Sequence, residues 1–190
     1  MNELIFESFP EFNTQRLLLR QITQEDDKSL LEVLSDEDTC EYLTHNAVND
    51  MENIRRMIAG MQRFFDEKQR IRWGIAQKTD NVLIGHCGFF DIDKFNCSAE
   101  ISYCLKRGSW GQGIMTEAVD AMLRFGFEDY GFNRIVAKVI KGNAGSIKVL
   151  QKLGFVQEGI LRESLLKNGQ YHDLIVFSVL KSEYHTCDKD

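Results

Sequence analysis

Apolar residues in the first third of the chain recur with a helical period. Between residues 51 and 65 they stand three or four positions apart, at Met51, Ile54, Ile58, Met61 and Phe65. This spacing traces one face of a helix, and either Asn49 or Asp50 is a plausible N-cap for it. Upstream, residues 16–22 predict a strand, and Thr23 with Asp26 three positions later is typical of a helix start.

Two predicted hairpins follow from turn chemistry. Residues 71–77 and 82–90 are strand-like and flank a polar turn, so we expect them to pair antiparallel. Near the end of the chain, residues 155–166 and 171–180 flank Lys167-Asn168-Gly169-Gln170. Asn-Gly between apolar runs is the strongest short hairpin signal.

A strand, a glycine-rich loop and a helix succeed one another between residues 99 and 125. Residues 99–105 alternate, which places Glu100, Ser102 and Cys104 on one face of a strand. The helix expected over 114–125 leads to a β-branched strand at 133–140, which we expect to lie parallel to the first. A short helix over 144–153 then ends at a glycine, a common helix stop.

Composition limits the class of protein. The chain has 190 residues, 43% apolar and 27% charged, which predicts one globular domain over 1–190 with a core at about 14–182. With 23 basic and 29 acidic residues the net charge is −6, so we expect no nucleic-acid partner.

Localisation and metal content are also predicted. Residues 1–7 carry acidic residues where a signal peptide is positive, and no apolar run approaches the roughly 18 residues of a membrane helix, so we expect a cytoplasmic protein without membrane contact. Five cysteines without a C-x-x-C pair predict reduced thiols. The histidines lack the i, i+4 spacing of a helical metal pair, so we expect no metal site.

The glycine-rich loop is the strongest candidate for chemistry. Its order is G-x-x-G-x-G at Gly108, Gly111 and Gly113, which is neither the dinucleotide fingerprint nor a P-loop. Such a loop at a helix start suits an anion such as a pyrophosphate, although turn glycines alone give the same pattern.

With its neighbours the loop resembles the GNAT superfamily of acetyl-CoA-dependent N-acetyltransferases, specifically the RimJ/RimL type that acetylates protein N-termini. The resemblance rests on four pieces that occur in order, at residues 14–20, 99–103, 110–118 and 143–155. It covers nearly the whole chain. It implies an α/β (α+β) fold, a twisted mixed and mostly antiparallel sheet of about seven strands flanked by four helices.

The resemblance also implies a binding site for acetyl-CoA, with residues 110–116 around the pyrophosphate and exposed backbone near 103–105 along the pantetheine arm, where two strands splay. The implied cofactor-binding residues are Tyr103, Cys104, Leu105, Trp110, Gly111, Gln112, Gly113, Ile114, Met115, Thr116, Asn143 and Ser146. Asn143 would bond the pantetheine, or it serves only as a helix cap.

The chain departs from the wider superfamily at two positions. Gly108 stands where many members carry Gln or Arg, and Leu150 stands where many carry a tyrosine that protonates the departing thiolate. Ser146 is the substitute acid that the RimJ/RimL pattern suggests. As a mid-helix serine, its hydroxyl could equally be solvated or bonded to the backbone.

Glu100 is the candidate base, because a carboxylate in an apolar strand either faces solvent or lies in a cleft for a reason. A backbone N–H near Tyr103 or Cys104 is expected to receive the oxyanion. Cys104 itself is expected to pack rather than act as a nucleophile. Residues 171–173 either line the acceptor side or stabilise the hairpin.

These expectations define an N-acetyltransferase that transfers acetyl directly to a primary amine, most simply a protein N-terminal α-amine. An α-amine has a pKa of about 7.7–8.0, so a modest base suffices. Two alternatives stay open, a small amine such as a polyamine, amino acid or aminoglycoside, and a non-catalytic acetyl-CoA-binding sensor. Monomer and homodimer are both compatible with the sequence.

Overall fold

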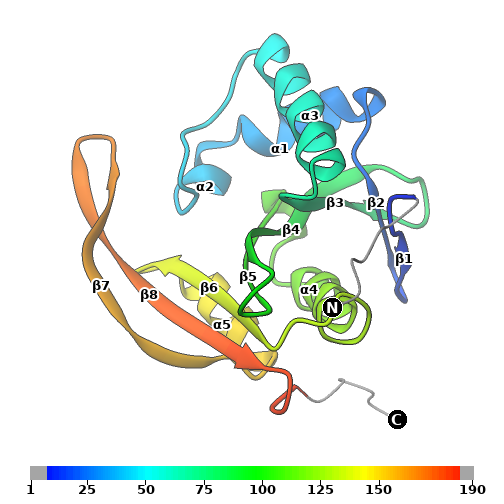
Figure 1. Ribbon diagram of the computed structural model, residues 1–190. Coiled ribbons are helices and arrows are strands. Elements are labelled where there is room, and N and C mark those ends of the chain that lie inside the picture. The colour runs from blue at the N-terminus through cyan, green and yellow to red at the C-terminus, as the bar shows by residue number, and fades with distance from the viewer. Residues whose placement is uncertain (1–7, 185–190) are drawn as a thin grey trace.

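The computed structural model describes residues 8–184 (Figure 1). The strands are β1 (Phe12–Asn13), β2 (Leu17–Gln21), β3 (Ile71–Gln77), β4 (Leu83–Asp93), β5 (Ser98–Leu105), β6 (Arg134–Ile140), β7 (Val156–Lys167) and β8 (Gln170–Leu180). The α-helices are α1 (Asp27–Leu34), α2 (Glu37–Cys40), α3 (Met51–Asp66), α4 (Ile114–Arg124) and α5 (Ala144–Lys152). Short 3-10 turns span Gln24–Asp26 and Arg107–Ser109, and a π-helical turn spans Phe125–Asp129.

All eight strands form one sheet in the order β1-β2-β3-β4-β5-β6-β8-β7. Neighbours are antiparallel except for β5 and β6, which run parallel. The mixed, mostly antiparallel sheet is therefore confirmed. The described residues hold one strand and one α-helix more than expected, because β1 and α2 have only two and four residues and are too short to produce a period.

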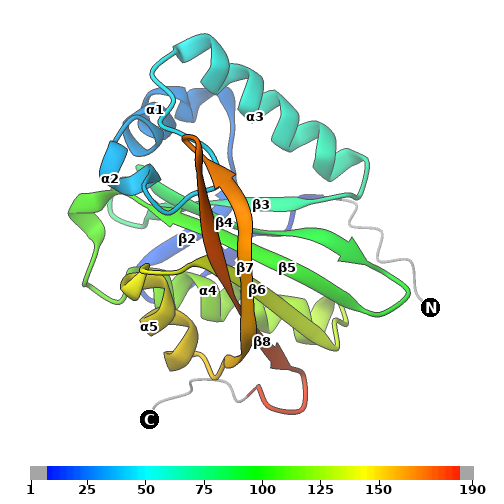
Figure 2. The same cartoon turned by 90° about the vertical axis from the view of Figure 1, so that its left-hand side faces the viewer.

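Helices cover both faces of the sheet. In Figure 2, α1 and α3 lie above it and α4 and α5 below it. The larger core packs β-strand side chains against α4, with Trp73 edge-on to Phe125 and Phe89. A smaller core joins α1 and α3 to the sheet through side chains such as Leu30 and Ile54. Each fully buried large apolar side chain contributes roughly 1.5–3 kcal/mol.

Local sequence signals fall where they were expected. Asp50 is the N-cap of α3, and its side chain accepts a hydrogen bond from the Glu52 amide. Asn168 and Gly169 both have positive φ in the turn between β7 and β8, as a type I′ hairpin requires. Thr23 and Asp26 form the predicted capping box, although it opens a 3-10 turn before α1.

Some expectations concern residues outside this range. The signal-peptide argument rests on residues 1–7, and Cys187 and His185 lie beyond residue 184. Within residues 8–184 no helix is both long and apolar enough to cross a membrane. The same residues contain no cluster of potential metal ligands, and Cys40, Cys87, Cys97 and Cys104 are free thiols.

Candidate active site

A gap opens in the middle of the sheet, between β5 and β6. The two strands pair only from Ser98 with Arg134 to Glu100 with Val136. Beyond Glu100, β5 continues along β4, whereas β6 stays with β8. The strands therefore splay along the segment where the resemblance places the pantetheine arm.

The pleat decides which backbone groups of β5 face this gap. The Lys106 amide donates to the Ile84 carbonyl on β4 (2.8 Å), and amides two residues apart on a strand point the same way. The amide of Cys104 therefore points to its β4 neighbour His86, and the amide of Tyr103 points into the gap. Of the two oxyanion donors expected, the geometry favours Tyr103 and argues against Cys104.

The Cys104 thiol packs with the apolar side chains beneath α1 and α3. It is 5% exposed, and burial raises its pKa to about 12. At neutral pH the thiol is protonated, and a protonated thiol is a poor nucleophile. The packing role expected for Cys104 agrees with this environment.

The glycine-rich loop lies at the start of α4, beside the open end of the gap. Gly111 and Gly113 have φ values of 74° and 75°, a region that glycine enters without steric cost. The first intrahelical bond of α4 is donated by Glu117 to the Gly113 carbonyl (3.1 Å). The amides of residues 113–116 thus precede the helical ladder and, with the helix dipole, suit an anion.

An ion pair ties this loop to the N-terminal strand. Glu117 accepts hydrogen bonds from the Thr14 hydroxyl (2.6 Å), the Arg16 amide (2.8 Å) and Arg16 Nε (2.7 Å). The same guanidinium donates from Nη1 to the Gln112 carbonyl (2.9 Å). Burial opposes ionisation of Glu117, but these bonds lower its pKa. Sequence reasoning assigned neither residue a role, although both lie in the segments that carried the resemblance.

Two side chains of the loop fold back on the chain. The Trp110 indole donates to the Leu105 carbonyl (2.7 Å), and the Gln112 amide donates to the Gly108 carbonyl (3.0 Å). Leu105 was expected to offer its backbone to the pantetheine. Its carbonyl accepts the Trp110 bond and, with two lone pairs, keeps room for a second donor.

Asn143 and Ser146 lie at the start of α5, on the other side of the gap. The Asn143 side chain accepts a hydrogen bond from the Ser146 amide (3.0 Å), so its role as N-cap is confirmed. Its side-chain NH2 group is not used by this bond and keeps its donors. The Ser146 hydroxyl lies 2.7 Å from that of Tyr103, so the structure brings a predicted acid together with the residue whose amide faces the gap.

Glu100 lies on β5 where the splay begins. Its side chain is 12% exposed and its carboxylate pairs with Lys138 Nζ at 2.6 Å. Burial raises the pKa of Glu100, and the hydrogen bond from Lys138 opposes the rise. The carboxylate is therefore not on the open surface. Sequence reasoning missed Lys138, although its place on the parallel strand, two residues past Val136, puts it on the same face.

The turn end of the β7–β8 hairpin bends out of the plane of the sheet and reaches α2 (Figure 1). The Lys167 ammonium donates to the carbonyls of Cys40 (2.6 Å), Glu41 (2.8 Å) and Leu43 (2.9 Å). This contact closes a bridge over the face of the sheet that carries Glu100. It was not foreseen, because the residues it joins are more than 120 positions apart.

Residues 171–173 take part in the hairpin. Tyr171 and His172 pair with Leu166 and Leu165 across the strands. The Asp173 carboxylate accepts the Glu163 amide (3.0 Å) and pairs with Lys141 (3.3 Å). These contacts support the hairpin-stabilising interpretation.

The residues that carry this geometry also match a known family. The Acetyltransferase (GNAT) domain family matches residues 16–156, well over half of the chain. The chain belongs to the GNAT acetyltransferase family. The N-acetyltransferase p20 of Bacillus licheniformis is 39% identical over 171 residues, which span 90% of this chain and 96% of that protein. The present chain is an N-acetyltransferase of the same family.

Two further similarities concern acceptors of other family members. The ribosomal-protein-serine acetyltransferase of Escherichia coli (strain K12) is 31% identical over 99 residues, 52% of this GNAT chain and 55% of that protein. The structure of spermidine N-acetyltransferase from Vibrio cholerae, in complex with CoA and spermine, matches with a TM-score of 0.79 at 20% identity, over 90% of this chain and 99% of that one. At that identity the second match shows the fold.

Proposed function

We propose that this GNAT enzyme transfers the acetyl group of acetyl-CoA directly to the α-amine of a protein N-terminus. The observation that carries the proposal is the adjacency of two features, the free amides at the start of α4 and the gap between β5 and β6. An anion-binding helix start beside an open strand edge suits a long thioester with a diphosphate at one end.

The proposed roles follow from the positions of the side chains. Amides of residues 113–116 bind the diphosphate, and Asn143 donates its side-chain NH2 to the pantetheine. The Tyr103 amide receives the charge that develops on the thioester oxygen. Residues 110–112 complete the loop, which Arg16 and Glu117 hold in place.

In the proposed reaction the amine nitrogen attacks the thioester carbonyl, a C–N bond forms and the C–S bond breaks. Glu100 accepts the proton that the ammonium group loses, through one water. The Ser146 hydroxyl, bonded to Tyr103, gives a proton to the coenzyme A sulfur and recovers one from solvent. The nitrogen loses its second proton to solvent as the C–S bond breaks. The sum is one acetyl group moved to nitrogen, one proton moved to sulfur and one proton released to solvent.

Two measurements test the proposal. Calorimetry at low salt should show uptake of acetyl-CoA, and the absence of uptake would overturn the proposal. Mass spectrometry should then find acetylated product with peptides that begin with Ala or Ser. Product with spermidine or an aminoglycoside and none with peptides would transfer the assignment to a small-amine acetyltransferase.

A further inference from the structure

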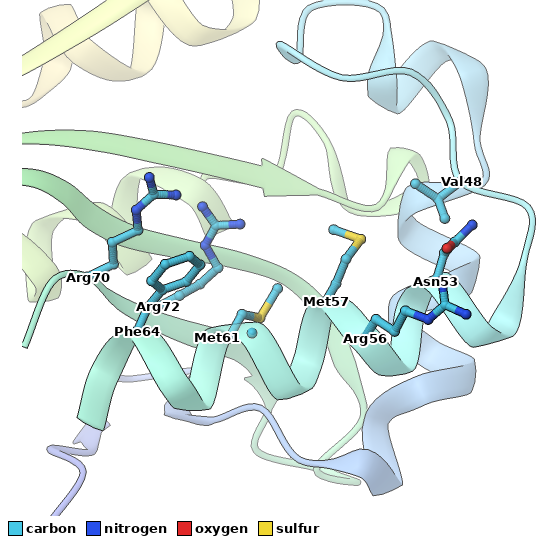
Figure 3. A pocket seen from close by; sticks show the side chains of 9 residues that line it. Val48, Asn53, Arg56, Met57, Met61, Phe64, Arg70 and Arg72 are labelled. Atoms are coloured by element: carbon cyan, nitrogen blue, oxygen red, sulfur yellow. The ribbon is translucent and has the colours of Figure 1, made fainter. Parts of the chain in front are cut away.

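A hollow of about 520 Å³ lies between α3 and the start of β3 (Figure 3). Its walls are mostly apolar, with Met57, Met61 and Phe64 projecting from α3, which also contributes Asn53 and Arg56 to the lining. At one end Arg70 and Arg72 lie beside Phe64, as Figure 3 shows. The hollow thus combines apolar walls with a cationic end.

These two arginines differ from most arginines of the chain. In an acid-rich protein, most guanidinium groups elsewhere pair with carboxylates, as in Arg16–Glu117, Arg20–Asp26 and Arg55–Asp27. Within residues 8–184, Arg72 has one hydrogen bond, from Nη2 to the Ser102 hydroxyl (3.3 Å), and Arg70 lies 4.7 Å from the centre of the Phe64 ring. Neither of the two has a carboxylate partner there.

Arg70 is exposed and Arg72 is half-buried. A cation without a counter-charge is costly where water is partly excluded, and the cost therefore falls on Arg72. Burial and the like charge of Arg70 lower the pKa of Arg72. An anionic group between the two guanidiniums would offset this cost, and guanidinium binds carboxylate through two parallel hydrogen bonds.

The cationic end is close to the proposed reaction centre. Arg72 bonds to Ser102, which lies two positions after Glu100 on β5. Side chains two positions apart share a strand face and are separated by about 7 Å. A carboxylate held by Arg72 would therefore lie one residue length from an amine at Glu100.

We infer that Arg70 and Arg72 bind a carboxylate of the acceptor, and that the enzyme selects α-amines with an acidic group one residue away. This inference rests on the proposed function and names its substrate class. Two sources share this chemistry, an acidic side chain at the second position of a protein N-terminus and the terminal carboxylate of a dipeptide. Polyamines carry the opposite charge and are disfavoured.

The experiment uses full-length enzyme and three peptides that differ only at the second residue, Ala-Glu, Ala-Gln and Ala-Lys. The expected kcat/KM is at least about tenfold higher for the Glu peptide than for the Gln peptide, since a charged hydrogen bond contributes roughly 1.5–3 kcal/mol. Free Ala-Gly, whose acidic group is its terminal carboxylate, distinguishes a dipeptide source from a protein source.

Variants connect the preference to these arginines. Arg72→Met and Arg70→Gln should lower turnover of the Glu peptide toward that of the Gln peptide and leave acetyl-CoA affinity unchanged in calorimetry. Arg63→Gln is the matched control, because Arg63 lies on α3, pairs with Glu67 at 3.9 Å and does not line the hollow. Thermal melts of each variant check that the fold is retained, and Arg70→Gln tests the inference if Arg72→Met unfolds.

Two results would overturn the inference. One is equal kcat/KM for the Glu and Gln peptides, which leaves N-terminal acetylation standing. The other is a preference that survives both arginine variants. Failure to bind acetyl-CoA, or product only with amines that carry no carboxylate, would instead overturn the proposed function and the inference with it.

Discussion

The hydroxyl groups of Tyr103 on β5 and Ser146 on α5 lie 2.7 Å apart. Burial raises the pKa of Tyr103 to about 12, while the bond with Ser146 opposes the rise. The phenol therefore stays protonated at neutral pH. In a chain with leucine at position 150, this pair is the proposed source of the proton for the departing sulfur.

Ser146→Ala is expected to lower kcat by about 100-fold, the lower range for loss of an acid catalyst, without a change in acetyl-CoA affinity. If Tyr103 acts through Ser146, Tyr103→Phe lowers kcat as well and the double variant is no slower than Ser146→Ala. Steady-state kinetics with calorimetry measure both quantities. Wild-type kcat in Ser146→Ala would remove the serine from the mechanism.

Glu100 should control the acidic limb of the pH profile. Burial raises its pKa, so its basic form is lost at a higher pH than for an ordinary glutamate, and kcat/KM should rise with pH through that raised value. Lys138→Met removes the cation that opposes the rise, so the limb should move to higher pH. Glu100→Gln should abolish it. A limb that stays in place in both variants would contradict a role for Glu100.

Glu117 is expected to contribute both to the free energy of unfolding and to the conformation of the glycine-rich loop. Its lowered pKa means that its stabilising bonds are fully present above the unfolded-state pKa and are lost as pH falls through the folded-state value. Glu117→Gln should lower the free energy of unfolding at pH 7 by about 1–3 kcal/mol and weaken acetyl-CoA binding. Denaturant titration measures the first effect. Glu52→Gln, in an exposed pair with Arg56, should cost less than about 1 kcal/mol.

The loop glycines allow a matched comparison. Gly111→Ala places a side chain at a φ of 74°, which costs roughly 1–2 kcal/mol. The strained loop should bind acetyl-CoA several-fold more weakly in calorimetry. Gly108→Ala is the control, because no φ in the left-handed region and no nearby atom constrains that glycine. Equal effects of the two substitutions would show that the loop conformation is not what binds the diphosphate.

Lys167 should restrain the β7–β8 hairpin against the segment at the end of α2. Lys167→Met leaves three carbonyls of the α2 turn without their shared donor. We expect faster amide exchange in residues 160–172 and a higher KM for the acceptor with acetyl-CoA affinity unchanged. Lys181→Met, at an exposed lysine, should change neither. An unchanged exchange pattern in Lys167→Met would show that the contact does not restrain the hairpin.

The local features of this protein were determined by the sequence alone. The spacing from Met51 to Phe65, the cap at Asn49 or Asp50 and the turn at Asn168 each depend on residues within a few positions of one another. The same holds for the order of strand, glycine loop and helix from β5 to α4. Periodicity and turn chemistry are local effects, so a linear pattern is enough to predict them.

The site depended on contacts between distant segments. Lys138 beside Glu100, Arg16 on Glu117 and Lys167 on the α2 carbonyls all join residues from different elements. That Arg72 has no carboxylate partner within residues 8–184 is likewise visible only after the chain has folded. Ion pairing and desolvation depend on distance in space, and in this protein only the packing of the sheet against its helices determined those distances.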